Sequence, residues 1–99
     1  MQRLALLLAI AATAACAPRT PPLVTASDAS RANVELADLE HGRTLLIQKC
    51  GNSCHATPMP GSHLPSEWPA KLGEMAERSH LDPMQRALIE KYLVTMASR

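Results

Sequence analysis

Residues 50–55 have the sequence CGNSCH, and this stretch decides how the rest of the chain is interpreted. It places two cysteines, Cys50 and Cys54, directly before a histidine, His55. Haem attachment needs two thiols that reach the vinyl groups and a histidine held against the iron, and this arrangement at the end of a helix supplies both. The common spacing has two residues between the cysteines, whereas this chain has three. The glycine and asparagine after the first cysteine favour a looped-out conformation that accommodates the extra residue.

The motif by itself leaves two other interpretations open. In an oxidising compartment Cys50 and Cys54 could form a plain disulfide. Alternatively, the two cysteines and His55 could bind zinc together with a distant histidine, either His63 or His80. The surrounding sequence is therefore needed to choose between them.

The residues before the motif are predicted to form a helix over roughly 34–49. Their apolar positions fit helical spacing: Leu36, Leu39, Leu45, Leu46 and Ile47. A glycine in the middle of a helix costs about 1 kcal/mol relative to alanine. Gly42 therefore indicates a place where another element approaches the helix closely.

Two more helices are predicted after the motif. The first covers about residues 66–79, with Ser66 as its N-cap and an apolar stripe made of Trp68, Leu72 and Met75. The second begins at the N-cap Asp82, followed by Pro83 and by Gln85 in a capping box. No segment alternates with period two for long enough to form a strand, so the predicted fold class is all-α.

The N-terminal residues 1–16 are predicted to be a secretory signal. Arg3 precedes an uncharged apolar run that is too short to span a bilayer and that ends in small residues. The sequence Thr13-Ala14-Ala15-Cys16 resembles a lipoprotein cleavage box, although Thr13 replaces the usual leucine. Since two of the three cysteines belong to the motif, a lipid on Cys16 would explain the third. We expect a periplasmic protein anchored to a membrane through Cys16, with an unmodified thiol or complete removal of the signal as alternatives.

The remaining residues divide into a linker and one domain. Residues 17–32 contain three prolines and small polar side chains without an apolar period, which predicts an extended, flexible linker. Residues 33–99 form the predicted domain, which has one Trp, one Tyr and no Phe to bury and therefore needs an additional staple. Once Arg3 is removed with the signal, acidic and basic residues balance, which argues against nucleic-acid binding.

The motif and its surroundings together resemble the family of small c-type cytochromes. Residues 40–50 are similar to the family's N-terminal helix, which leads into the haem motif, and residues 87–93 are similar to its C-terminal helix. In the family these helices cross at a glycine, an apolar residue one turn later and an aromatic residue. Gly42, Leu46 and Tyr92 match these positions.

The resemblance continues beyond the motif and spans roughly residues 39–96. It covers residues 55–58 and the sequence Glu67-Trp68-Pro69 followed by Met75, a pattern of short bacterial members. It implies a small cytochrome c-like helical domain wrapped around one covalently bound haem c. The haem, a large flat apolar group, would then complete a core that has few aromatic side chains.

The motif residues are the expected haem-binding groups. The resemblance implies that Cys50 and Cys54 hold the haem through thioether bonds and that His55 is the proximal ligand of the iron. The imidazole of His55 should donate its other N–H to a backbone carbonyl, for which residues 58–60 are the expected source.

The expected distal ligand is Met75, because it lies on the same predicted apolar stripe as Trp68. The alternatives are Met84 and His80, or a role for Met75 as a flexible core side chain. Met59 follows the proximal histidine too closely to reach the opposite face of the haem.

Two further expectations concern side chains near the site. Trp68 should pack near the haem edge and donate its indole N–H to a propionate, or else simply fill the core. His41 and His63 are expected to face solvent.

A haem with histidine and methionine as axial ligands has no open position for a substrate and therefore performs outer-sphere electron transfer. We expect an exported monohaem electron carrier that exchanges electrons with redox proteins and is not an enzyme. The alternatives are a five-coordinate haem sensor or gas-binding protein, the haem-bearing subunit of a larger oxidoreductase, and an interaction lipoprotein stapled by a disulfide or zinc.

Overall fold

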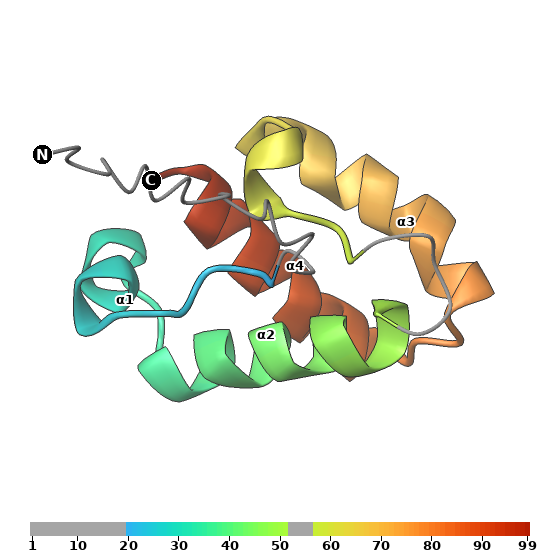
Figure 1. The fold of residues 1–99 in the computed structure, drawn as a ribbon, viewed down its shortest axis with the longest axis horizontal. Coiled ribbons are helices and arrows are strands. Elements are labelled where there is room, and N and C mark those ends of the chain that lie inside the picture. The colour runs from blue at the N-terminus through green and yellow to red at the C-terminus, as the bar shows by residue number, and fades with distance from the viewer. Residues whose placement is uncertain (1–19, 52–56) are drawn as a thin grey trace, which may run out of the picture.

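The computed structural model describes residues 20–51 and 57–99 (Figure 1). These residues form four α-helices and two short 3-10 turns: α1 (Ala26–Ala32), α2 (Leu36–Cys50), η1 (Pro60–Ser62), η2 (Pro65–Glu67), α3 (Trp68–Arg78) and α4 (Pro83–Ala97). Within the described ranges there is no strand, and the predicted all-α class is confirmed.

The core is built on the packing of α2 against α4. Gly42 of α2 is buried, and a Cβ atom at this position would overlap the carbonyl oxygen of Leu88 and lie 3.0 Å from the Cβ of Tyr92. Leu46, one turn after the glycine, and Tyr92 are both 0 % exposed. The close approach predicted from Gly42 is therefore confirmed, and Tyr92 lies at the crossing.

The remaining core side chains come from α3 and the rest of α4. Side chains of α2, α3 and α4 form one buried cluster, called the core cluster below: Leu45, Leu46, Cys50, Trp68, Leu72, Ile89, Tyr92, Leu93 and Met96. The N-terminal end of α4 is as predicted, because Asp82 accepts a hydrogen bond from the Gln85 N–H at 2.7 Å and the Gln85 side chain accepts one from the Asp82 N–H at 3.1 Å.

The start of α3 differs from the sequence prediction. The helix begins at Trp68, and the predicted N-cap, Ser66, lies inside the preceding turn η2. Glu67 closes this turn, because its carboxylate accepts a hydrogen bond from the Leu64 N–H at 3.0 Å. The prediction of Ser66 as N-cap is wrong because the turn continues directly into the helix.

The N-terminal segment also differs from the predicted flexible linker over residues 17–32. Its described part, residues 20–32, packs on the domain and ends in α1. Thr25 caps α1, and the Asp28 side chain accepts a hydrogen bond from the Thr25 N–H at 2.9 Å, which completes a capping box. The linker prediction is wrong here because this box, and not an apolar period, marks the start of α1.

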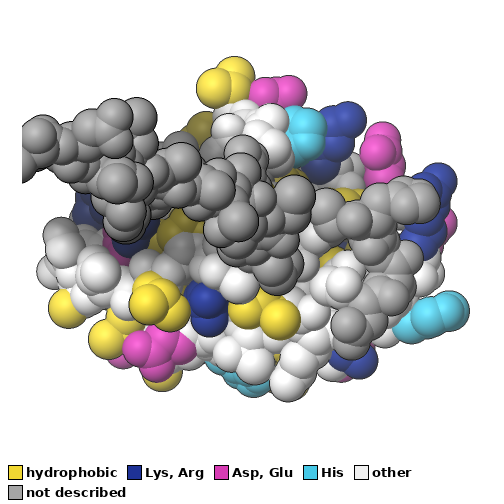
Figure 2. Space-filling view, in the orientation of Figure 1, with side chains coloured by type: hydrophobic (Ala, Val, Ile, Leu, Met, Phe, Trp, Pro, Cys, Tyr) yellow, Lys and Arg dark blue, Asp and Glu magenta, His cyan; other side chains and the backbone are white. Residues whose placement is uncertain are grey.

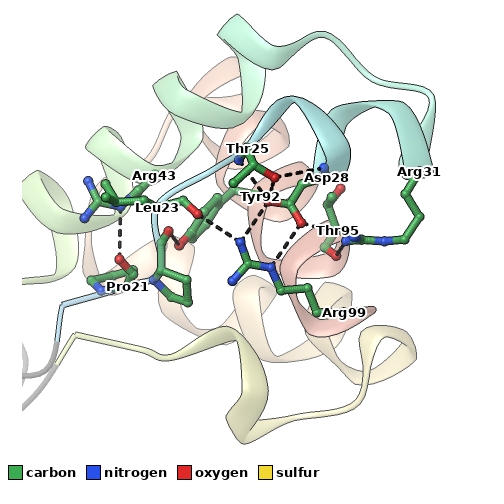
Figure 3. Close-up of polar contacts among 10 residues, drawn as sticks. Pro21, Leu23, Thr25, Asp28, Arg31, Arg43, Tyr92, Thr95 and Arg99 are labelled. Atoms are coloured by element: carbon green, nitrogen blue, oxygen red, sulfur yellow. Dashed lines mark hydrogen bonds and ion pairs between the residues drawn. The ribbon is translucent and has the colours of Figure 1, made fainter.

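A group of ion pairs joins α1 to the C-terminal end of α4 (Figure 3). It consists of Thr25, Asp28, Arg31 and Arg99 and is called the Asp28 cluster below. Asp28 is 2 % exposed and accepts hydrogen bonds from Arg99 at 3.0 and 2.9 Å and from Arg31 at 3.0 Å. Arg31 also donates to the carbonyl of Thr95 at 2.9 Å, so the cluster fixes α1 on α4.

Residues 21–23, before α1, accept further hydrogen bonds from α2, from α4 and from Arg99, which follows α4. Arg43 donates to the carbonyl of Pro21 at 3.0 Å, the Tyr92 hydroxyl donates to that of Pro22 at 2.7 Å, and Arg99 donates to that of Leu23 at 3.1 Å. Burial raises the pKa of Tyr92 to about 12, so this hydroxyl remains a donor at neutral pH.

The Asp28 cluster predicts how stability depends on pH. The Arg99 guanidinium holds the pKa of Asp28 well below its usual range, against the opposing effect of burial. An acid with a lowered folded pKa stabilises the fold above its unfolded pKa, about 3.9 for Asp, and this contribution is lost as the pH falls further. We expect the free energy of unfolding to fall between about pH 5 and pH 2 more steeply in the natural protein than in Asp28→Asn.

Urea unfolding followed by circular dichroism at a series of pH values measures this difference. At pH 7 Asp28→Asn should cost about 1–3 kcal/mol, because both guanidinium partners are partly exposed to solvent. Glu74→Gln, on the exposed side of α3, is the matched control and should leave the profile unchanged. Parallel pH profiles for Asp28→Asn and the natural protein would contradict the prediction.

Candidate functional site

The cysteine motif begins at the C-terminal end of α2. Cys50 is the last residue of this helix and is 0 % exposed within the core cluster. Residues 52–56, which include the predicted haem-binding residues Cys54 and His55, lie outside the described part of the chain. The structure therefore places one of the three motif residues, and it places that residue among apolar side chains.

Gly51 and Thr57, the described residues on the two sides of residues 52–56, lie close together. The Gly51 N–H continues the helical pattern by donating to the carbonyl of Ile47 at 3.0 Å. A Cβ atom on Gly51 would lie 3.3 Å from the side-chain oxygen of Thr57. The chain therefore leaves α2 and resumes at the same place, next to the buried Cys50.

The structure separates the candidates for the distal ligand. Met75 is half-buried on α3 and packs against the core cluster that contains Cys50. Met84 is 67 % exposed on the first turn of α4, and His80 is exposed in the turn between α3 and α4, with a positive φ of 53°. Met96, near the end of α4, is 4 % exposed in the same cluster.

Trp68 has a role different from the predicted propionate contact. It is 1 % exposed, and its indole N–H donates to the carbonyl of Pro60 at 2.9 Å. The donor is therefore committed to the backbone of η1, and Trp68 connects this turn to the start of α3. The prediction of a propionate partner is corrected, whereas its alternative, core packing, is what the structure shows.

His63 is also placed differently from the prediction. It is half-buried and packs edge-on against Trp68, with the ring centroids 4.9 Å apart and the ring planes at 89°. The prediction that His63 faces solvent is wrong because this turn folds back onto the indole. His41 is exposed, as predicted.

Residues 58–60 were expected to supply the carbonyl that orients His55. Two of their carbonyls accept hydrogen bonds from other groups. The Met59 carbonyl accepts hydrogen bonds from the N–H and the hydroxyl of Ser62 at 3.0 and 2.7 Å. The Pro60 carbonyl accepts the indole N–H described above. These bonds give the segment after the motif a defined shape.

Charges are distributed evenly on the visible surface. In Figure 2, basic and acidic side chains of the described residues are interspersed, without a large patch of one sign. Within residues 20–51 and 57–99 no group of three or more His, Cys, Asp and Glu side chains could hold a metal ion. In the same ranges no helix is both long enough and apolar enough to cross a bilayer.

Comparisons with protein-family models, with curated proteins and with solved structures found no match to this chain.

Proposed function

We propose that this chain is an exported monohaem c-type cytochrome that carries one electron at a time between redox proteins. The observation that supports the proposal best is the burial of Cys50, the first cysteine of CGNSCH, at the end of α2. Met75 of α3 packs against the same cluster, so the methionine side chain and the first cysteine of the motif lie in one apolar region.

The proposed haem is supported by the residue types of the motif and by the apolar surroundings of Cys50. A haem c held through Cys50, Cys54 and His55 would supply a one-electron iron couple, and a methionine as sixth ligand favours the ferrous form. Its apolar ring would be received by side chains of α2, α3 and α4 that already exclude water from Cys50. Met75 is the proposed sixth ligand because Met84 and His80 lie on the surface.

The described residues form a frame that would support the proposed ligands. The crossing at Gly42 fixes α2, and the hydrogen bond from Trp68 to Pro60 fixes the segment after the motif on α3. Ligands held by a rigid frame move little when the charge of the iron changes, which suits electron transfer. We propose no enzymatic activity, and the expected partners are an electron donor and an electron acceptor.

Covalent haem attachment is the first test of this function. The full-length chain, produced with its own signal in a bacterium that has haem-attachment machinery, should gain the mass of one haem. Denatured protein should keep haem-dependent peroxidase staining on a gel, because thioether bonds survive denaturation. The double variant Cys50→Ala/Cys54→Ala should lose the covalently bound haem and its staining.

The other outcomes separate the alternatives. A colourless product that contains zinc or an internal disulfide would contradict the haem proposal. It would favour an interaction lipoprotein whose fold is stabilised by zinc or by a disulfide between Cys50 and Cys54. A haem protein whose resting spectrum is high-spin and five-coordinate would indicate a sensor or a gas-binding protein.

We also propose that the protein lies in the periplasm and is anchored to the membrane by a lipid on Cys16. The support is the sequence of residues 1–16, which lie outside the described part of the chain.

A further inference from the structure

We propose that the surface around residues 20–24 faces the membrane and that the domain is held against the bilayer without a flexible spacer. This inference rests on the proposed lipid on Cys16. It identifies the surface that meets the membrane and, through it, the class of redox partner that the protein can reach.

The chain between the proposed lipid and the described fold is short. Three residues, 17–19, separate Cys16 from the first described residue, Thr20. Even fully extended, the chain from Cys16 to Thr20 spans at most about 14 Å. A linker that continued to residue 32 would instead reach about 55 Å. Because residues 20–32 pack on the domain, the maximum distance that the chain can span between the lipid and the fold falls by a factor of about four.

The start of the packed segment is firmly attached to the domain. Pro21 is buried, and Arg43 of α2 donates to its carbonyl at 3.0 Å. The carbonyls of Pro22 and Leu23 accept hydrogen bonds from Tyr92 and Arg99. Lengthening the anchor would require breaking these three bonds, each of which is made by a different part of the domain.

The surface beside the anchor has a chemistry that suits contact with a bilayer. Leu23 is 71 % exposed; Arg43 donates to the carbonyl of Pro21, and Arg99, which is paired with Asp28, donates to the carbonyl of Leu23 itself (Figure 3). An exposed apolar side chain two residues from the carbonyl that binds the Arg43 guanidinium suits the interface of a bilayer with anionic headgroups. The lipid would supply most of the binding energy, and this surface would orient the domain.

The consequence for electron transfer follows from α2. Arg43 and Cys50 lie seven residues apart on this helix, which is about 10 Å along its axis. The haem motif is thereby confined to the neighbourhood of the membrane. The partner that fits this geometry is a redox protein embedded in the membrane or bound to its surface, because the short anchor does not allow the domain to cross the periplasm.

Fluorescence quenching by lipid headgroups tests the orientation. Leu23→Cys and Met84→Cys give two labelling sites of nearly equal exposure, 71 % and 67 % for the natural side chains. Met84 lies at the opposite end of α4 from Arg99, which contacts Leu23, so the sites are about 20 Å apart along the helix. Each haem-bearing, lipid-bearing variant is labelled with the same thiol-reactive fluorophore. It is then placed in vesicles of phosphatidylethanolamine and phosphatidylglycerol.

The quencher is a fraction of lipid that carries a spin label on its headgroup. The ratio of fluorescence with and without the spin label cancels quenching by the haem itself. We expect several-fold stronger quenching at position 23 than at position 84. A ten-residue Gly-Ser insertion after Ala17 should reduce the quenching at position 23 to the level at position 84.

The failures can be told apart. Equal quenching at the two positions in membrane-bound protein would overturn the orientation and leave the lipid anchor standing. If the protein stays out of the membrane fraction, with an N-terminal peptide that carries no lipid mass, the anchor and the orientation both fail. Cys16→Ser, which should release the protein with its haem spectrum unchanged, is the control for that case.

Discussion

Met75→Ala is expected to abolish the weak near-infrared charge-transfer band of the oxidised protein and the strongly upfield-shifted methyl resonance of the reduced protein. Both signals arise when a methionine sulfur binds haem iron. The haem should stay attached, because the thioether bonds involve other residues, and its spectrum should become high-spin or hydroxide-bound. The reduction potential should fall, since the soft ligand that favours ferrous iron is removed. Absorption, proton NMR and redox titration of the purified protein measure these changes.

Two other methionines serve as controls for this variant. Met84 is 67 % exposed, so Met84→Ala should change neither the spectrum nor the stability appreciably. Met96 is buried in the core cluster, so Met96→Ala should keep the band and cost about 2–5 kcal/mol in the free energy of unfolding. If Met96→Ala is the only variant that loses the band, the sixth ligand is Met96 on α4. If Met75→Ala keeps the band, the assignment to Met75 is wrong. If the natural protein itself lacks the band, the sixth ligand is His80 or the sixth position is open. An open position would favour a sensor.

Gly42→Leu is expected to lower the free energy of unfolding by about 3 kcal/mol or more, the upper range for overpacking. A side chain at this position would overlap the carbonyl of Leu88, and a backbone carbonyl in the middle of α4 cannot move aside as a side chain can. The two helices would have to separate, which also disturbs the packing of Tyr92. Urea unfolding of the haem-bearing protein measures the change.

A pair of alanine variants provides the matched control. Gly42 and Gly73 both lie inside helices, and alanine is the better helix former at such positions by about 0.5–1 kcal/mol. At Gly73 the nearest atom to an added Cβ is the end of the exposed Arg86 side chain, 3.2 Å away, which can move. Gly73→Ala should therefore be neutral or stabilising, whereas Gly42→Ala should destabilise. Equal effects at the two glycines would contradict the crossing as the cause.

The elements that the sequence predicted correctly are those with local signals. The capping box at Asp82 and the helical spacing before Cys50 lie within short stretches, and the structure has α4 and α2 where they indicate. Gly42 predicted a long-range contact because an unfavourable residue inside a helix needs a reason elsewhere. Ser66 was misleading, because a local cap signal was overridden by the turn that precedes α3.

The packing of the N-terminal segment could not be predicted because it depends on pairs far apart in the sequence. Asp28 and Arg99 are 71 residues apart, and Tyr92 and Pro22 are 70 apart. A short helix of alanine, serine and charged residues shows no apolar period, and the capping box at Thr25 was the one local signal for it. At the candidate site, the apolar stripe predicted that Met75 faces the core, as the structure shows, but the hydrogen bond of Trp68 depends on where η1 lies.

If the chain is exported as proposed, the long sequence separation within the Asp28 cluster also sets an order of events. The segment after Cys16 would leave the translocation channel well before Arg99, so the contact between Asp28 and Arg99 would have to wait for the residues between them. Contacts that close such long loops form late because loop closure costs entropy before any contact stabilises it. An enzyme that cleaves beside Cys16 or attaches a lipid there would therefore act on an extended chain. The domain would then close onto the membrane surface after the modification is complete.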